Sequence, residues 1–300
     1  MVRSKIMQKT AKYSNISEKI MQAIFFLSAL ISVLAVLAIC LFLFLRGIPA
    51  IAEIGISDFI FNETWGPTNK PPSYGILSMI VGSIYVTAGA ILIGVPIGLM
   101  CAIFLAEFCP DSVYKIVKPA VNLLAGIPSI IYGFFGMEIV VPFVRENFGG
   151  NGYSVMSASI ILGIMILPTI ISLSESSIRA VPDSYMEGSY GLGATKEETV
   201  FKVIVPAAKS GVLTSIILGI GRAVGETMAV VMVAGNAVMP IDSIELLKPI
   251  RTLTTNIVTE MSYASGLHES ALIATGVVLF VFIVILNTSL SLIKSKTQRN

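Results

Sequence analysis

The sequence predicts an all-α membrane protein that crosses the bilayer about six times. Three observations predict this class: 55% of the 300 residues are hydrophobic, only 13% are charged, and the mean hydropathy is +0.86. Soluble domains carry about 25% charged residues, so this chain has too little charged surface to fold in water. Its net charge of +2 is too small to indicate a nucleic-acid partner. We therefore expect a multi-pass protein of the cell (plasma or inner) membrane, surrounded by lipid.

Six apolar runs are long enough to span a bilayer, which takes about 20 residues each. We expect these spans at residues 21–45, 76–106, 119–144, 155–173, 211–235 and 271–293. The first run follows a basic stretch, as a signal peptide does. The run is, however, longer than the apolar core of a signal peptide, which has roughly 7–15 residues. We therefore interpret it as a retained anchor.

Lysine and arginine set the orientation of such a chain, because they concentrate in cytoplasmic segments. Most of the 20 lysines and arginines become cytoplasmic if the N-terminus is inside, and both termini then lie in the cytoplasm. The expected organisation is a cytoplasmic N-terminal segment (1–20), a first helix with an outer loop (21–75), a transmembrane domain (76–293) with a cytoplasmic loop at 174–210, and a cytoplasmic tail (294–300).

Proline and glycine interrupt several predicted spans. We expect breaks at Gly94-Val95-Pro96, Gly126-Ile127-Pro128 and Leu167-Pro168, because proline removes a backbone donor and clashes with the preceding turn. The freed carbonyls must be satisfied by protein or by a water-lined cavity. Gly221 and Gly225 have the four-residue spacing that allows close helix packing. Broken helices favour a transporter over a simple anchor.

The outer segments 46–75 and 236–270 are long enough to contact a partner outside the cell, or to serve only as capping loops. In the second segment the spacing of apolar residues predicts an amphipathic helix at the outer surface. These residues are Leu247, Ile250, Leu253, Ile257 and Met261.

Arg222 and Glu226 lie in the stretch GIGRAVGETMA, inside the fifth predicted span. A charge at mid-bilayer costs about 2.5–3.5 kcal/mol on insertion scales, and a four-residue spacing places both side chains on one helix face. A guanidinium matches the oxygens of phosphate. Arg222 is therefore a candidate anion ligand that Glu226 holds in place, with Thr227 supplying a hydroxyl. The alternative is an internal ion pair that joins helices without touching a substrate.

Two further residues are candidates for a substrate path. Ser129 begins a helix after Gly-Ile-Pro, where backbone amides favour an anion, although a kink for packing explains the motif equally well. Glu138 lies in the third span, near the outer face, where an interfacial position is the alternative. We expect no metal site and no catalytic group, because the three cysteines lack metal spacing and His268, at a loop edge, is the only histidine.

The cytoplasmic loop has the pattern of two short helices. Ser184 with Glu187, and Thr195 with Glu198, each fit the S/T-x-x-E capping box that begins a helix. Glycines lie between the two boxes, where an elbow is expected.

The loop ends at Pro206, with Gly193 in its elbow. A compact unit of this kind can insert into a groove on a partner, and an ordinary structured loop is the alternative. The apolar anchors of such docking are Tyr185, Met186 and Tyr190.

The same loop resembles the inner-loop signature of ABC importer permeases, which is EAA, three residues, G, nine residues and I-x-L-P. Glu187 begins the match, Gly193 follows six residues later, and VIVP closes it at Pro206. Gly188 and Ser189 replace the two alanines, and valines replace Ile and Leu. The resemblance extends over nearly the whole chain to PstC-type permease subunits of phosphate-specific ABC importers. It is carried by the stretches WGP, YGILSMIVGSIYVT, GVPIGLMCAIFLAE, LAGIPSIIYGFFG and GIGRAVGETMA.

This resemblance implies a MetI-like permease core that forms half of a phosphate pathway. Charged residues matching Arg222 and Glu226 are implicated in translocation in that family, and the inner loop docks on an ATPase subunit. The implied partners are a second, PstA-type permease, a dimer of a PstB-type ATPase that binds ATP and Mg, and an extracytoplasmic PstS-type phosphate-binding protein.

The chain itself is expected to bind no cofactor and to catalyse no reaction, because it has no G-x-x-x-x-G-K-[ST] motif and neither HExxH nor GxSxG. The alternative function is an ion-coupled secondary anion transporter, with Glu226 and Glu138 as the coupling acids. Such a transporter would work alone, whereas an ABC permease needs its ATPase.

Overall fold

The fold is known from a computed structural model that describes the backbone of residues 2–299 and the side chains of residues 18–289, 291 and 292. Over this range the chain is helical apart from a small antiparallel pair of two-residue strands, β1 (Trp65–Gly66) and β2 (Ser73–Tyr74). The predicted all-α class is confirmed. The predicted segments 1–20 and 294–300 lie largely outside the residues whose side chains are described.

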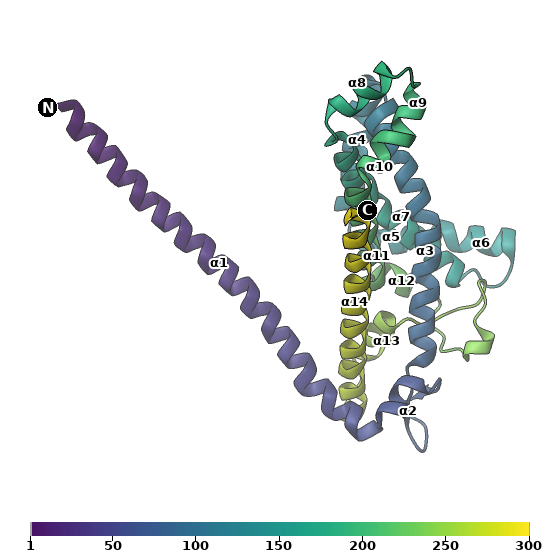
Figure 1. Ribbon diagram of the computed structural model, residues 1–300. Helices are drawn as coiled ribbons and strands as arrows, with labels where there is room; N and C mark the ends of the chain where they lie inside the picture. The colour runs from purple at the N-terminus through teal and green to yellow at the C-terminus, as the bar shows by residue number, and fades with distance from the viewer. Residues whose placement is uncertain (1, 300) are drawn as a thin grey trace.

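The helices follow one another along the whole chain (Figure 1). They are α1 (Val2–Ile54), α2 (Ile56–Phe61), α3 (Leu77–Ile103), α4 (Asp111–Gly126), α5 (Ser129–Phe135), α6 (Val141–Phe148), α7 (Val155–Arg179), α8 (Asp183–Gly191), α9 (Lys196–Thr199), α10 (Val205–Ala207), α11 (Lys209–Gly225), α12 (Met228–Val233), α13 (Leu253–Glu260) and α14 (Leu267–Arg299). Wider π-helical turns continue three of them: η1 (Phe104–Phe108) after α3, η2 (Gly136–Val140) after α5 and η3 (Val200–Ile204) after α9. A 3₁₀ turn, η4 (Ile241–Ser243), precedes α13.

The six predicted spans appear as four straight helices and two bent ones. The straight candidates are Glu18–Ile54, Leu77–Phe108, Val155–Arg179 and Leu267–Ser289. In the third predicted span, Asp111–Gly126 and Ser129–Phe148 meet at 101°. The fifth predicted span begins in Lys209–Gly225, which meets Lys196–Ala207 of the inner loop at 69°. The count of about six membrane helices is therefore confirmed, with each bent pair taken as one span.

Of the three predicted breaks, only the one at residues 126–128 is confirmed. Helices α3 and α7 continue through Pro96 and Pro168, so the other two predictions are wrong. These two helices have the most extensive contact in the bundle. A Cβ added at Gly94 or Gly98 would lie 2.7 or 2.9 Å from an isoleucine side chain of α7. The glycines of α3 therefore serve close packing, which holds both helices straight across their prolines.

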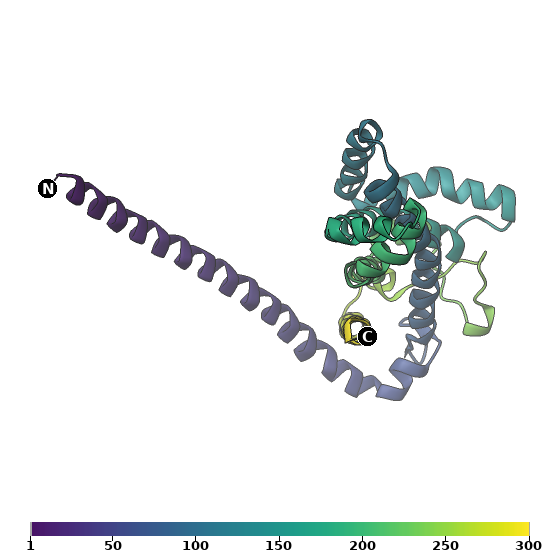
Figure 2. The same cartoon turned by 45° about the horizontal axis from the view of Figure 1, so that its top comes forward.

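Helix α7 forms the centre of the bundle, and α1 lies outside it. The apolar window of the α7 span is 67% buried, whereas that of the α1 span is 0% buried. Figures 1 and 2 show α1 leaning away from the other helices. It contacts α14 near its C-terminal end, where Phe44 and Phe280 stack edge to face and Gly47 fits against Ala274.

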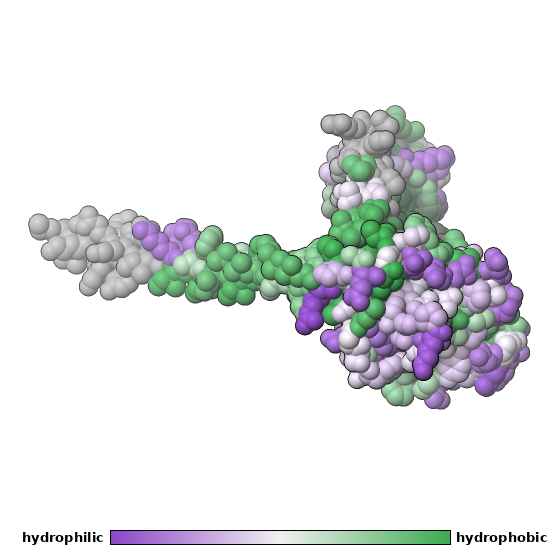
Figure 3. Space-filling model, turned by 90° about the horizontal axis from the view of Figure 1, so that it is seen from below, coloured by the Kyte–Doolittle hydropathy of each residue, from purple (hydrophilic) through white to green (hydrophobic). Residues whose placement is uncertain are grey.

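The two ends of the bundle differ in the segments that cover them. Helices α8 to α10 lie at one end, and α2 lies at the other together with the chain that leads to α3 (Figure 1). Viewed from the α2 end, the bundle surface is largely hydrophilic while α1 is hydrophobic (Figure 3). A polar end on a bundle that is flanked by an apolar helix fits a protein that crosses a membrane.

The amphipathic helix predicted from Leu247 to Met261 is mostly wrong. Only α13 (Leu253–Glu260) forms, because Thr252 caps its first turn and Ile250 forms a bridge with Gly235 instead. Helix α13 packs against α14, α3 and α12. This segment is therefore an inserted part of the bundle and not a surface helix.

Candidate functional site

The helix is interrupted within the stretch GIGRAVGETMA. Helix α11 ends at Gly225, Glu226 is extended with φ −73° and ψ 133°, and α12 begins at Met228. The prediction that Arg222 and Glu226 share one helix face is therefore wrong. Among the described side chains, no ion pair joins these two residues.

Arg222 is half-buried near the end of α11 and has few partners of its own. Within the described part of the chain, its guanidinium makes one hydrogen bond, from Nη1 to the Thr169 hydroxyl at 3.5 Å. Arginine carries five N–H donors, and lipid provides no acceptors for them. The guanidinium is thus arranged to receive an acceptor from outside this chain, and an anion is the ligand that matches its charge.

Glu226 has a separate environment. One oxygen of the Glu226 carboxylate accepts a hydrogen bond from the Ala229 backbone N–H at 3.2 Å. The backbone carbonyl of Glu226 accepts another from the Thr254 hydroxyl at 3.1 Å. Its side chain also lines a cavity of about 10 Å³, close to the minimum for one water molecule. The polar side chains around this cavity are those of Ser83, Thr87, Thr252 and Thr254. The cavity is too small for a phosphate ion in this conformation.

The break itself is open. A Cβ added at Gly225 would meet no atom within 4 Å, and one added at Gly221 would have Asn287 Oδ1, at 3.7 Å, as its nearest neighbour. The predicted close packing at these two glycines is therefore wrong. Thr227 lies in the break and donates a hydrogen bond to the Gly225 carbonyl at 3.4 Å.

Ser129 and Glu138 lie apart from this centre. Ser129 is the first residue of α5, after Pro128 at the N-cap. Glu138 is exposed in η2, on the arm that bends by 101° from α4. Neither side chain has a hydrogen bond or ion pair with Arg222 or Glu226 in the described residues. The structure does not gather the predicted path residues into one cluster.

The inner loop contains the two expected helices. Thr195 and Glu198 form the predicted capping box, with bonds of 3.2 and 3.3 Å. The box predicted at Ser184 is wrong, because α8 already begins at Asp183 with a proline before it. The glycine elbow is confirmed: Gly193 has φ +84°, a conformation that favours glycine.

Helix α8 exposes most of the residues expected to meet a partner. None of its residues is buried, and Tyr185 and Tyr190 are 50% and 41% exposed. Glu187 and Pro206 are also exposed. Leu192 is 91% exposed, yet sequence reasoning missed it. The sequence feature that could have identified Leu192 is its position between two glycines at the tip of a loop.

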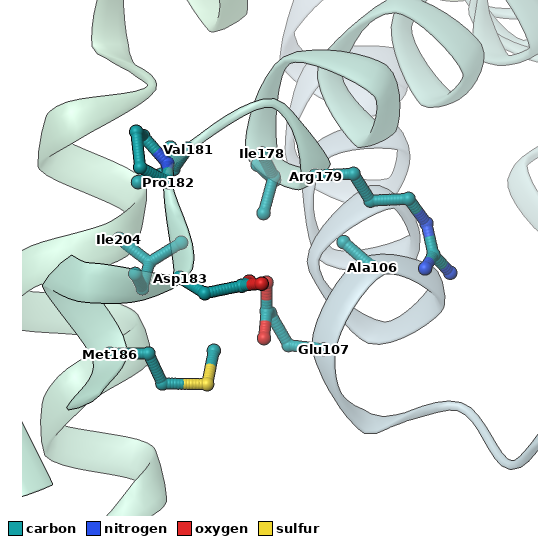
Figure 4. A pocket seen from close by; sticks show the side chains of 9 residues that line it. All are labelled: Ala106, Glu107, Ile178, Arg179, Val181, Pro182, Asp183, Met186 and Ile204. Atoms are coloured by element: carbon teal, nitrogen blue, oxygen red, sulfur yellow. The ribbon is translucent and has the colours of Figure 1, made fainter.

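Met186 points the other way. It packs against the apolar cluster formed by α7, η3 and the end of α3, so its side chain does not face a partner as expected. It also lines a cavity of about 200 Å³ in which the carboxylates of Glu107 and Asp183 face each other (Figure 4). Met186 therefore joins α8 to the bundle.

A buried carboxylate anchors the bundle beneath this loop. Glu175 is 2% exposed and accepts hydrogen bonds from Tyr114 at 2.8 Å, from Arg179 at 2.7 Å and from Lys118. Arg179 also donates to the Leu105 carbonyl at 2.6 Å. These bonds connect α4, α7 and η1. Sequence reasoning missed this cluster because its members are up to 74 residues apart.

A second buried carboxylate, Glu260, organises the opposite end. It accepts hydrogen bonds from Arg251 at 2.5 Å, from Trp65 Nε1 at 2.8 Å and from His268 Nε2 at 2.8 Å. Burial raises the pKa of Glu260, but these three donors and the charge of Arg251 outweigh it, so the pKa lies below its ordinary value. His268 is thus part of an ion cluster and not an isolated loop residue.

The fold and these sites define an integral membrane permease that depends on partners. It has a bundle of membrane helices, an exposed inner loop of paired helices and, in the described residues, no cluster of metal-binding side chains. The chain belongs to the family described as binding-protein-dependent transport system inner membrane component, whose model matches residues 94–299. Proteins of this family are non-catalytic membrane components of ABC importers, in which the ATPase is a separate subunit.

Several curated proteins are similar over most of the chain. A probable ABC transporter permease protein, YqgH of Bacillus subtilis, is 40% identical over 84% of this chain and 83% of that protein. The phosphate transport system permease protein PstC of Mesorhizobium japonicum is 37% identical over 85% and 83%. PstC of Haemophilus influenzae is 34% identical over 92% and 93%.

Solved structures share the fold. A chain of the MetNI methionine ABC transporter in an inward-facing conformation has a TM-score of 0.57 and 21% identity, covering 74% of this chain and 97% of that one. A chain of an amino acid ABC transporter has a TM-score of 0.54 and 19% identity, covering 74% and 93%. The predicted MetI-like core is confirmed.

Proposed function

We propose that this chain is the PstC-type permease subunit of an ATP-driven importer of inorganic phosphate, in which it forms half of the translocation pathway. One observation of the structure carries this proposal: Arg222 presents a guanidinium in a membrane-spanning helix with a single hydrogen bond, at 3.5 Å. The similarity to phosphate permeases over most of the chain supports phosphate as the anion.

The substrate path in this proposal is centred on Arg222. The guanidinium binds phosphate oxygens, and Thr227 supplies a hydroxyl from the open break. Glu226 does not hold Arg222 through an ion pair; its negative charge near the path instead limits how tightly the anion binds. Ser129 and Glu138 belong to the path only in the assembled transporter, through other conformations or contacts with the second permease.

The inner loop couples this path to ATP hydrolysis. In the proposal, α8 to α10 insert into a groove of the ATPase, with Tyr185, Tyr190 and Leu192 as apolar contacts. Glu187 lies on the exposed side of α8, Gly193 provides the elbow, and Met186 and Pro206 support the loop from its base. The loop and both termini are then cytoplasmic, in agreement with the distribution of lysine and arginine.

The partners follow from the same assignment. Membership of a binding-protein-dependent family implies an ATPase and a binding protein. We propose that these are a PstB-type ATPase dimer, which binds ATP and Mg, and an extracytoplasmic PstS-type phosphate-binding protein, with a PstA-type permease completing the pathway. The ion-coupled secondary transporter is disfavoured, because this family uses a separate ATPase subunit.

The test is phosphate uptake by the assembled complex in proteoliposomes. We expect uptake that needs both the binding protein on one side and ATP on the other, and that stops when ATP is replaced by a non-hydrolysable analogue. Leu192→Asp should weaken copurification of the ATPase, whereas Leu292→Asp, the same change at an exposed leucine of α14, should not.

Two outcomes would contradict the proposal. One is uptake of phosphate by this chain alone, driven by an ion gradient. The other is an assembled complex that hydrolyses ATP but imports an unrelated solute and no phosphate.

A further inference from the structure

Several serine and threonine hydroxyls inside the membrane helices bond to their own helix. In five cases the hydroxyl donates to the carbonyl four residues earlier, a common way to satisfy a polar side chain in a helix. These residues are Ser28, Ser83, Ser177, Thr214 and Thr275. Thr169 and Ser172, both in the middle of α7, do not follow this pattern.

The hydroxyls of Thr169 and Ser172 contact side chains of other helices. Thr169 accepts the bond from Arg222 of α11 at 3.5 Å, and Ser172 donates to the amide oxygen of Asn122, in α4, at 3.4 Å. Thr169 therefore keeps its own hydroxyl hydrogen available, and Asn122 keeps both hydrogens of its NH₂ group. Within the described residues, no hydrogen bond uses these donors.

These donors lie on the inner-loop side of Arg222. Thr169, Ser172 and Ser176 have the i, i+3, i+7 spacing of a single helix face, and at 1.5 Å per residue they cover about 10 Å along α7. Helix α7 continues from Thr169 to Arg179, directly before α8 at the loop end of the bundle (Figure 1). The polar face thus leads from the guanidinium toward the loop.

The surroundings of Asn122 indicate what this face is for. Asn122 is exposed, and its neighbour Leu123 is 73% exposed. Asn122 lies near the start of the third predicted span, in α4, and its NH₂ group has no hydrogen bond within the described residues. An exposed amide beside two hydroxyls and an under-bonded guanidinium is placed to contact a polar ligand.

We propose that Thr169 and Asn122, the latter held by its bond from Ser172, form a second oxyanion subsite, on the inner-loop side of Arg222, built from neutral hydrogen-bond donors. An oxyanion that leaves the guanidinium for these neutral donors keeps hydrogen bonds but loses the attraction of the fixed positive charge. The subsite therefore favours release toward the inner loop. This inference rests on the proposed function, because it assigns the next position of the same anion.

The test is made in the complete complex. It compares variants that remove a hydrogen-bonding group but keep the side-chain shape with variants that keep the group but change the shape. Thr169→Val keeps the shape and removes the hydroxyl, and Thr169→Ser keeps the hydroxyl. Asn122→Leu and Asn122→Gln make the same separation for the amide. Thr275→Val is the matched control, since it removes a hydroxyl that is already bonded within its own helix. Uptake of labelled phosphate and the amount of assembled complex are measured for each.

We expect Thr169→Val and Asn122→Leu each to lower the maximal uptake rate about ten-fold, the effect of one lost bond to a charged ligand. Assembly should stay unchanged, and Thr169→Ser and Thr275→Val should transport normally. The inference is overturned if Thr169→Val and Asn122→Leu transport normally while Arg222→Gln does not, an outcome that leaves the proposed function standing. It is equally overturned if Thr169→Ser fails as Thr169→Val does, because shape would then matter and not the donor. A wild-type complex that imports no phosphate overturns both proposals together.

Discussion

Arg222 and Arg251 are the same residue in two very different surroundings. Arg251, at the α2 end of the bundle, donates to the Asn236 carbonyl at 2.8 Å, to Asn256 at 3.1 Å and to Glu260 at 2.5 Å. Arg222, in the α11 span, makes one hydrogen bond at 3.5 Å. Both side chains are at least partly shielded from solvent, so water alone does not account for the difference.

The contrast separates a structural arginine from one that is available to a ligand. Arg251 and Glu260, with Trp65 and His268, form a closed cluster in which each charge has partners within the chain. Arg222 has no carboxylate partner in the described residues, because the helix breaks before Glu226. An arginine held in a membrane without an internal carboxylate partner needs a ligand from outside the chain.

The largest effect is expected from Arg222→Gln. Phosphate uptake should fall by at least about 100-fold, because charge-assisted bonds to the anion are lost, while the melting temperature of the complex should not decrease. Uptake and thermal unfolding are measured on the same detergent-purified or reconstituted complex. A clear drop in melting temperature would mean that Arg222 is structural, as Arg251 is, and would remove the contrast.

Arg251→Gln should have the opposite profile. It leaves Glu260 buried without its main positive partner, which costs about 3–5 kcal/mol in comparable buried pairs. The complex should therefore unfold at a lower temperature or assemble poorly, while the complex that does assemble transports normally per molecule. Normal stability together with lost transport would place Arg251 in the substrate path instead.

Two glycines test the same contrast through packing. A Cβ at Gly82 would lie 2.6 Å from the Arg251 carbonyl, so Gly82→Ala should destabilise by about 1–3 kcal/mol. A Cβ at Gly225 would meet no atom within 4 Å, so Gly225→Ala should change stability by less than about 0.5 kcal/mol. Thermal unfolding of the two variants gives the comparison, and equal destabilisation would show that the break after α11 is closed in solution.

The smallest effect is expected from pH. Glu260 has a pKa below its ordinary value of 4.5, so it contributes stability above that value and loses it as the pH falls through the lower folded pKa. Part of the fall in melting temperature as the pH drops below about 4.5 should therefore disappear in Glu260→Gln. An unchanged pH dependence in that variant would assign the acid sensitivity to other carboxylates.

Local features were predicted where they depend on near neighbours in the chain. The Thr195–Glu198 capping box and the Gly193 elbow were predicted correctly, since each needs only a few residues. The break near Pro128 was also predicted. The breaks at Pro96 and Pro168 were not realised, because packing between α3 and α7 holds both helices straight. The proline signal is the same at all three positions, and only the neighbouring helix distinguishes them.

The candidate site shows the same limit. GIGRAVGETMA identified Arg222 as a candidate. The expected pairing with Glu226 assumed a continuous helix, whereas α11 ends at Gly225. The contacts of Arg222 with Thr169, and of Ser172 with Asn122, join residues 53 and 50 positions apart. No sequence period connects such positions.

The amino-acid sequence by itself determined that this chain is a helical membrane protein with an inner loop of paired helices, since hydropathy and capping act over short distances. It also determined that a guanidinium lies within a membrane span. Only the tertiary structure decided which charges are neutralised within the chain and which are left open. That outcome depends on where helices break and which helices then face one another, and these contacts join residues far apart in the sequence.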